Sequence, residues 1–75
     1  MNTLDKIRTG QKAVVTKIES KGQTKRRIMD MGLTKGTEIF CRKVAPLGDP
    51  IELTVRGYEL SVRRSDAKII NIEIC

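Results

Sequence analysis

The residues in this chain that could do covalent or metal chemistry are two cysteines, and their spacing matches no catalytic or metal-binding motif. Cys41 lies in mid-chain, Cys75 is the last residue, and the 75 residues include no histidine. A cysteine nucleophile needs a neighbouring base, and metal-binding or redox cysteines are closely spaced. The sequence also lacks the GxxxxGK[ST] loop that binds nucleotide phosphates. We therefore predict a protein that is not an enzyme, with no preformed metal site and no cofactor.

Anion recognition is the other chemistry open to the chain, because its basic residues are concentrated in the first half. Residues 1–44 hold eleven lysines and arginines and four acidic residues (net +7), residues 45–75 hold four and five (net −1), and the sum is the +6 of the whole chain. The basic run at residues 25–27 suits contacts with carboxylate or phosphate, although such runs are more often solvated helix faces. Phe40 and Tyr58 are the two aromatic residues, and so few stacking side chains disfavour nucleic acid as the partner.

A short helix is predicted at about residues 24–31, and it would carry this basic run. Thr24 is a suitable N-cap, and Ile28 and Met31 lie three positions apart on one face. Since Met29 and Met31 cannot both lie on the face of Ile28, we expect one methionine to be partly exposed.

Glycines and prolines mark the predicted turns. Gly32 ends the helix, and Leu33 is placed to pack back on it, as in a Schellman-type end. Residues 45–50 contain two prolines and a glycine and are therefore predicted to form a loop. The residues assigned to structural turns are Gly10, Gly32, Gly36, Gly48, Asp49, Pro50 and Gly57.

Alternating apolar residues predict five short strands, at residues 13–18, 38–44, 51–56, 58–63 and 69–74. In the first strand Val14, Thr16 and Ile18 share one face. A single helical turn with Ser65 as its cap precedes the last strand. Short antiparallel strands remove most exposed edges by closing into a small barrel. We therefore predict one all-β domain over residues 1–75, a five-stranded SH3-like barrel with the helix as a short insertion.

Two blocks of this sequence resemble those of a known family. The first is Arg-Ile-Met-Asp-Met-Gly-Leu at residues 27–33, followed by Gly36, and the second is Ala-Pro-Leu-Gly-Asp-Pro at residues 45–50. In this order and spacing they resemble the FeoA family, small cytoplasmic proteins of bacterial ferrous-iron uptake, and the resemblance extends over nearly the whole chain. It implies an SH3-like barrel and a partner, the membrane transporter FeoB, whose cytoplasmic GTPase region the FeoA proteins bind and modulate.

From the residues and this resemblance we predict a surface that contacts such a transporter, on the basic helix and the adjacent loop. The residues assigned to it are Lys25, Arg26, Arg27, Met29, Met31, Leu33, Pro46 and Leu47. We expect a cytoplasmic protein without membrane insertion, because no apolar run reaches the roughly 18–20 residues of a spanning helix.

Three alternative functions remain open at this point. The chain could be a free-standing relative of the C-terminal SH3-like domain of DtxR-type iron-dependent repressors, or a basic nucleic-acid-binding barrel. It could also be an iron-binding protein that uses Cys41, Cys75 and carboxylates. The sequence does not determine the oligomeric state, nor whether the partner's GTPase is activated or restrained.

Overall fold

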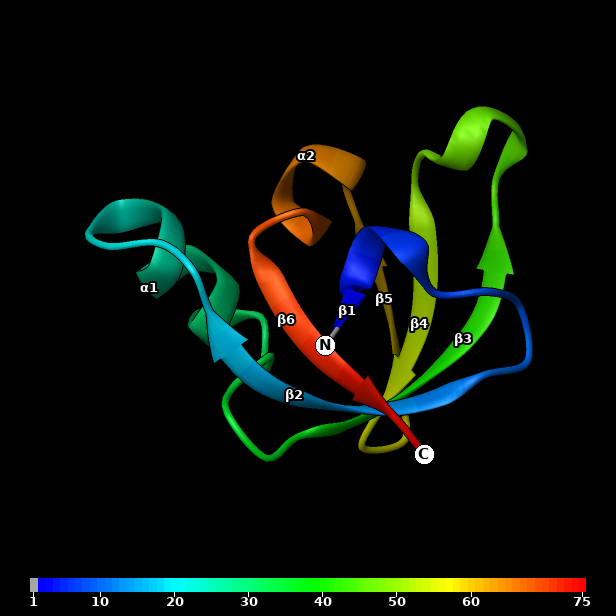
Figure 1. Cartoon of the computed structure of the whole chain (residues 1–75), viewed down its shortest axis with the longest axis horizontal. Coiled ribbons are helices and arrows are strands. Elements are labelled where there is room, and N and C mark those ends of the chain that lie inside the picture. The colour runs from blue at the N-terminus through cyan, green and yellow to red at the C-terminus, as the bar shows by residue number, and fades with distance from the viewer. Residues whose placement is uncertain (1) are drawn as a thin grey trace.

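Residues 2–75 are described by the computed structural model, in which an antiparallel six-stranded sheet carries four short helical segments (Figure 1). The strands are β1 (Asn2–Thr3), β2 (Lys12–Ile18), β3 (Glu38–Val44), β4 (Ile51–Val55), β5 (Tyr58–Val62) and β6 (Ile70–Ile74). The helical segments are the 3-10 turns η1 (Leu4–Lys6) and η2 (Pro46–Gly48) and the α-helices α1 (Gln23–Asp30) and α2 (Arg64–Ala67). None of the helices within residues 2–75 has the length and apolarity needed to cross a membrane.

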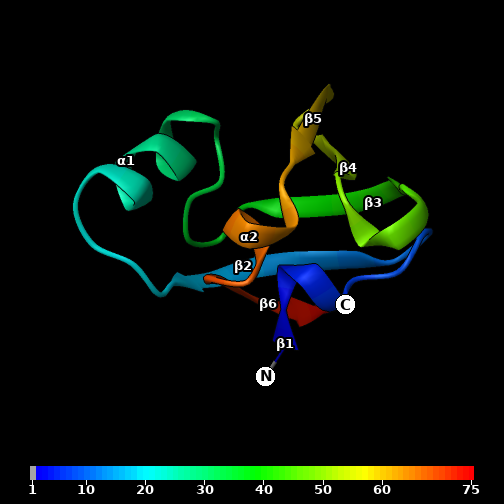
Figure 2. The same ribbon diagram turned by 90° about the horizontal axis from the view of Figure 1, so that it is seen from above.

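The sheet has the strand order β1-β6-β2-β3-β4-β5. It curls around the core, with β1 and β6 on one side and β4 and β5 on the other (Figure 2). This architecture confirms the predicted β-rich barrel with a short helical insertion, and the five predicted strands are β2 to β6. The sequence does not predict β1, because two residues show no periodicity. β1 exists because Asn2 and Thr3 pair with β6.

An aliphatic core fills the barrel. β4 turns Ile51, Leu53 and Val55 inward, and β6 contributes Ile70 and Ile72, all with no exposed surface. The other buried members of this cluster are Leu4, Ile7, Ala13, Val15, Ile18, Ile28, Leu33, Ile39, Cys41, Val62 and Ala67. Because α1 and the residues just after it add two of these side chains, burial of apolar surface attaches the helix to the barrel.

The strand β2 changes the face that it presents to the core partway along its length. Ala13 and Val15 are fully buried, and the next buried residue is Ile18, three positions further on. The pairing with β6 shifts register just after Val15, so Thr16 is the extra residue of a β-bulge. The prediction that Val14, Thr16 and Ile18 share one face is therefore wrong, because strict alternation does not survive a bulge.

The helix α1 begins and ends one residue earlier than predicted, and it ends in the predicted glycine motif. Gly22, with φ 72°, occupies the N-cap position in place of Thr24, and no side chain caps the helix. At the other end the N–H of Leu33 donates to the carbonyl of Ile28 at 3.3 Å. The N–H of Gly32 donates to the carbonyl of Met29 at 2.9 Å. These two bonds form a Schellman motif, which confirms the predicted helix end.

The helix α2 is capped by a residue from another loop. The prediction that Ser65 caps this helix is wrong, since Arg63 holds the N-cap position. The side chain of Arg63 makes no capping hydrogen bond. Instead, the N–H of Arg64 donates to Oδ1 of Asp49 at 3.2 Å, across 15 positions of the sequence. The β3–β4 loop therefore supplies the carboxylate that satisfies the start of α2.

The turn residues predicted from glycine and proline lie at the ends of the strands and helices. The five glycines Gly10, Gly32, Gly36, Gly48 and Gly57 all have positive φ, and the Asp49–Pro50 peptide bond is cis. The β4–β5 hairpin turns through Arg56 and Gly57, both with positive φ, which is the backbone of a type I′ turn.

Candidate partner-binding surface

The helix α1 projects from one end of the barrel and carries the predicted basic residues (Figure 1). Lys25, Arg26 and Arg27 are all exposed. Met29 is 43% exposed, whereas Met31 is half-buried and packs against the core. Met29 is therefore the methionine that turns away from the core, and the helix presents three cations and one apolar side chain to solvent.

The end of α1 is held by the barrel. Leu33 is fully buried, which corrects its assignment to the contact surface, because the residue after the Schellman glycine packs back into the core. The hydroxyl of Tyr58 donates to the carbonyl of Met31 at 2.6 Å. A Cβ on Gly32 would lie 2.0 Å from the same hydroxyl oxygen, so glycine is the residue that admits this contact.

Arg27 has an intramolecular partner. Its Nη2 lies 2.7 Å from Oδ1 of Asp66 in α2, and the two side chains are 57% and 15% exposed. Exposed ion pairs contribute at most about 1 kcal/mol to stability, but this one connects α1 to α2. Within residues 2–75 neither Lys25 nor Arg26 has an ion-pair partner. These two are therefore the cations of the run that remain available to an anionic partner.

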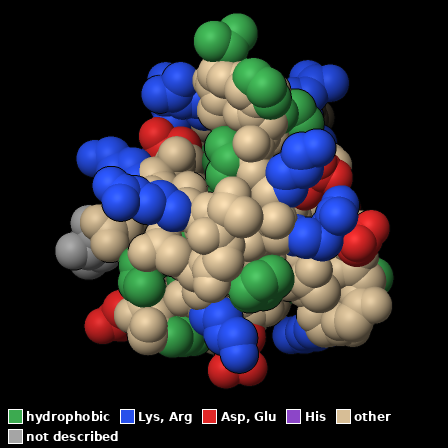
Figure 3. Space-filling view, turned by 90° about the vertical axis from the view of Figure 1, so that its right-hand side faces the viewer, with side chains coloured by type: hydrophobic (Ala, Val, Ile, Leu, Met, Phe, Trp, Pro, Cys, Tyr) green, Lys and Arg blue, Asp and Glu red, His purple; other side chains and the backbone are tan. Residues whose placement is uncertain are grey.

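The β3–β4 loop presents a fully solvated apolar side chain. Leu47 is 94% exposed and has φ 72°, a left-handed conformation that costs a non-glycine residue about 1 kcal/mol. Two backbone hydrogen bonds hold this loop. The N–H of Ala45 donates to the carbonyl of Pro50 at 3.1 Å, and the N–H of Gly48 donates to the carbonyl of Ala45 at 2.9 Å. Pro46 is also exposed, and hydrophobic side chains gather at this tip above several lysine and arginine side chains (Figure 3).

The basic helix and the loop form two separate patches. α1 and the β3–β4 loop lie at opposite ends of the upper side of the molecule in Figure 1, and α2 lies between them in both ribbon views. The prediction that the loop is adjacent to the helix is therefore wrong. α2 is nevertheless tied to both, through the ion pair of Asp66 with Arg27 and through the cap from Asp49. We call the side formed by α1, α2 and the β3–β4 loop the rim.

A groove of about 330 Å³ between α1 and the end of β2 adds residues that sequence reasoning missed. Its lining residues are Thr16, Lys17, Ile18, Lys25, Met29 and Lys35. Lys25 and Met29 lie one helical turn apart and were predicted as contact residues. Lys17 and Lys35 come from a strand and from a turn, and no pattern in the sequence links them to the helix.

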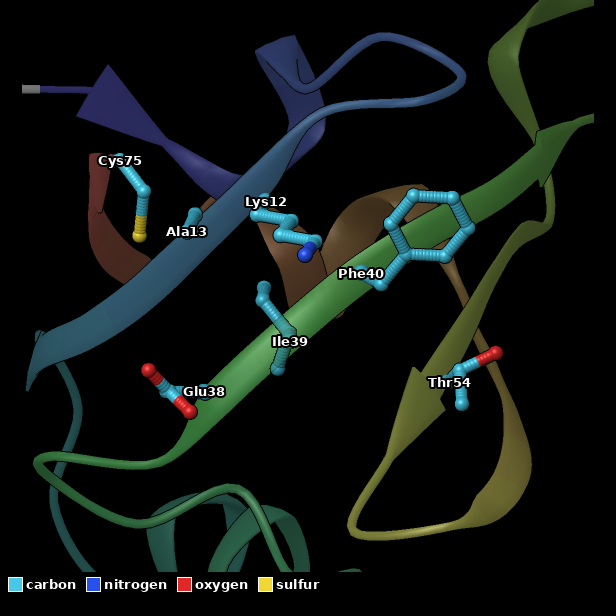
Figure 4. A pocket seen from close by; sticks show the side chains of 7 residues that line it. All are labelled: Lys12, Ala13, Glu38, Ile39, Phe40, Thr54 and Cys75. Atoms are coloured by element: carbon cyan, nitrogen blue, oxygen red, sulfur yellow. The ribbon is translucent and has the colours of Figure 1, made fainter.

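The two cysteines lie in different environments. Cys41 is fully buried in the core, and burial raises the pKa of its thiol. Cys75 is exposed and lines an open groove of about 240 Å³ with Lys12 and Phe40, on the outer face of β2 and β3 (Figure 4). Within residues 2–75 there is no group of three or more cysteine, aspartate or glutamate residues arranged to hold a metal ion.

Comparison with protein families and with curated proteins finds relatives of this chain. The family model described as FeoA domain matches residues 2–74. The Fe(2+) transport protein A/Fe(2+) transporter FeoB fusion protein of Porphyromonas gingivalis is 37% identical over 71 residues, which are 95% of this chain and 8% of that protein. The chain therefore spans a small part of the length of this curated relative.

Similar proteins of known structure share the fold. The FeoA-like protein of Clostridium acetobutylicum is 44% identical with a TM-score of 0.88, over 96% of this chain and 84% of that one. FeoA of Stenotrophomonas maltophilia, described as an SH3 domain protein and solved with zinc, is 25% identical with a TM-score of 0.82, over 97% and 91%. The manganese regulator SloR, at 18% identity and a TM-score of 0.82 over 95% and 33%, shows the fold alone.

Proposed function

The chain belongs to the FeoA domain family of ferrous iron transport, and we propose that it is an accessory protein that binds the cytoplasmic GTPase region of a FeoB-type transporter and modulates it. The proposed mode of action is recognition through the rim, without catalysis. Its exposed groups include cations and apolar side chains, which suit binding to a protein surface.

The observation that carries the choice of partner is the Porphyromonas gingivalis relative, whose name joins an Fe(2+) transport protein A to the transporter FeoB in one chain. Linking two domains by a short flexible segment raises the effective concentration of each near the other to about 1 mM. A fusion of this kind supports a direct interaction between the corresponding separate proteins.

The proposed contact surface has an apolar anchor at each end. Of the three large apolar side chains exposed within residues 2–75, Met29 and Leu47 lie on the rim, and the third is Tyr58. Binding energy in protein interfaces is concentrated in a few such anchors, which basic residues around them orient on the partner. The surface proposed to contact the transporter thus consists of Met29 with Lys25 and Arg26, and Leu47 with Pro46.

Modulation of the transporter follows if the rim binds one of its conformations more tightly than another. A ligand shifts a conformational equilibrium only by the difference in its affinity for the two states. A rigid barrel that contacts two separated points of the partner favours the conformation in which both points have the right spacing. The direction of the change in GTPase rate then depends on which conformation has this spacing.

The test is a calorimetric titration of the protein with the purified cytoplasmic region of FeoB, together with its GTPase rate. We expect Leu47→Asp and Met29→Asp each to weaken binding about tenfold or more, because each removes an apolar anchor. Ser61→Asp is the matched control, since it adds the same charge at an exposed position of β5, outside the three elements of the rim. Absence of binding by the unchanged protein would refute the partner, and equal affinity of all three variants would refute the surface.

Arg27→Glu is a poor probe of this surface. It would place two carboxylates together, since Arg27 pairs with Asp66, and weaker binding could then reflect a displaced α1. Lys25→Glu changes the charge of the same helix at a position with no ion-pair partner within residues 2–75. We expect this variant to weaken transporter binding while its unfolding free energy stays within about 0.5 kcal/mol of the original.

A further inference from the structure

The groove between α1 and β2 has the chemistry of a binding site for an anion with an apolar part. Its lining residues contribute three ammonium groups, from Lys17, Lys25 and Lys35, and no carboxylate. Nζ of Lys17 lies 3.4 Å from Oε1 of Glu19, so this lysine has an ion-pair partner outside the groove. The other two lysines have no ion-pair partner within residues 2–75, so their charges are available to a ligand.

The floor of the groove is apolar. Met29 is 43% exposed and Ile18 is 7% exposed, and both line the groove. Thr16, the bulge residue of β2, also lines it, and its Oγ1 is buried with no hydrogen-bond partner within residues 2–75. A flexible methionine side chain adapts its shape to different apolar groups.

An extended segment fits the geometry of the β2 end. The pairing of β2 with β3 covers Lys12 to Val14, whereas its pairing with β6 continues to Ile18. The turn after α1 bonds to Val15 on the β3 side. Residues 17–18 therefore have a strand on one side and the groove on the other, within residues 2–75. Strand ends of this kind accept an extended peptide alongside them.

We propose that the groove between α1 and β2 binds an extended acidic segment of the protein partner, with its carboxylates beside Lys25 and Lys35 and an apolar side chain against Met29. This inference rests on the proposed function, because it assigns the segment to the transporter. A peptide segment is favoured over nucleic acid because none of the six lining residues is aromatic, so bases would have no stacking platform there.

The first experiment measures fluorescence anisotropy of a short labelled peptide of alternating glutamate and leucine as the full chain is added. The control peptide has glutamine in place of each glutamate. We expect the acidic peptide to bind about tenfold more tightly, since two exposed ion pairs together give a difference of that order. Its affinity should also fall as salt screens the charges. Equal affinity for the two peptides would refute the charge recognition.

The second experiment compares two double variants with the same change in net charge. Lys25→Glu with Lys35→Glu alters the groove, and Lys6→Glu with Lys68→Glu alters exposed lysines outside it. We expect the first variant to lose about tenfold or more in affinity for the acidic peptide, and the second to lose less than about threefold. Equal losses would mean that net charge, and not the groove, binds the peptide.

The same variants, titrated with the FeoB cytoplasmic region, separate this inference from the function on which it rests. If the transporter binds the original protein and the Lys25/Lys35 variant equally well, the groove proposal is wrong and the proposed function stands. If the transporter does not bind the original protein, the proposed function is wrong, whatever the peptide does. A short single-stranded RNA that displaces the peptide and binds more tightly would overturn the choice of a protein segment.

Discussion

The helix α1 and the β3–β4 loop each present one large apolar side chain on the rim, Met29 and Leu47, but they are held in different ways. α1 is anchored by side chains: Ile28 is fully buried, and the hydroxyl of Tyr58 bonds to the end of the helix. The loop has no buried residue in η2 and keeps its shape through backbone hydrogen bonds. A protruding helix therefore depends on its core anchors, whereas a tight loop depends on its backbone conformation.

The largest expected effect tests the anchor of the helix. Ile28→Ala should lower the free energy of unfolding by about 3 kcal/mol, because it removes a fully buried side chain and leaves a cavity. Met29→Ala, at the next position but exposed, is the matched control and should change it by less than about 0.5 kcal/mol. Urea denaturation followed by circular dichroism measures both. Similar values for the two variants would show that α1 is not anchored through Ile28.

The next effect tests how closely the barrel approaches the helix end. Gly32→Ala should cost about 2–3 kcal/mol, since it forces a positive φ of 97° on alanine and drives a Cβ into the Tyr58 hydroxyl. Gly36→Ala, at φ 89° with no atom within 4 Å of the new Cβ, should cost about 1 kcal/mol. Thermal unfolding compares them. In a Tyr58→Phe background the difference should shrink, and a constant difference would contradict the overlap with the hydroxyl.

A smaller effect tests the link from the loop to α2. Asp49→Ala should destabilise the protein by about 1 kcal/mol, because the N–H of Arg64 loses its acceptor. Asp49→Asn keeps an acceptor oxygen at the same place and should lose less than half of that. Chemical denaturation of the two variants in parallel gives the comparison. If both variants lose the same amount, the charge of the carboxylate matters and the cap does not.

The smallest expected effect on stability comes from the loop tip. Leu47→Gly removes the positive-φ strain of leucine, and the greater freedom of glycine in the unfolded chain largely offsets this gain. The net change should therefore lie between zero and about 1 kcal/mol of stabilisation. Transporter binding should weaken at the same time, which separates a contact residue from a structural one. A clear loss of stability would mean that the exposed leucine supports the loop.

The turns and strands that were predicted correctly are those whose conformation depends on residues close by in the sequence. The Schellman end of α1 needs only the glycine at position 32 and the apolar residues around it, and Ile51, Leu53 and Val55 alternate within one strand. The same local reasoning failed in β2, because the bulge at Thr16 arises from pairing with β6. It also failed for the cap of α2, since the capping carboxylate is 15 positions away.

Only those residues of the candidate surface that lie close together in the sequence could be predicted. Lys25 and Met29 were found because they lie on one helix, and Leu47 because it lies between two prolines. Lys17 and Lys35 were missed, since only the fold of β2 against α1 brings them to one groove. Arg27 was assigned to a partner, and its contact with Asp66 joins segments 39 positions apart.

By itself the sequence determined the β-rich class, the basic first half and the positions of the turns, because these follow from residue types and their short-range spacing. The tertiary structure alone decided which charged groups meet, which methionine is exposed and how far the helix lies from the loop. The physical reason is that the curl of the sheet sets these distances, and the curl results from the packing of the whole core.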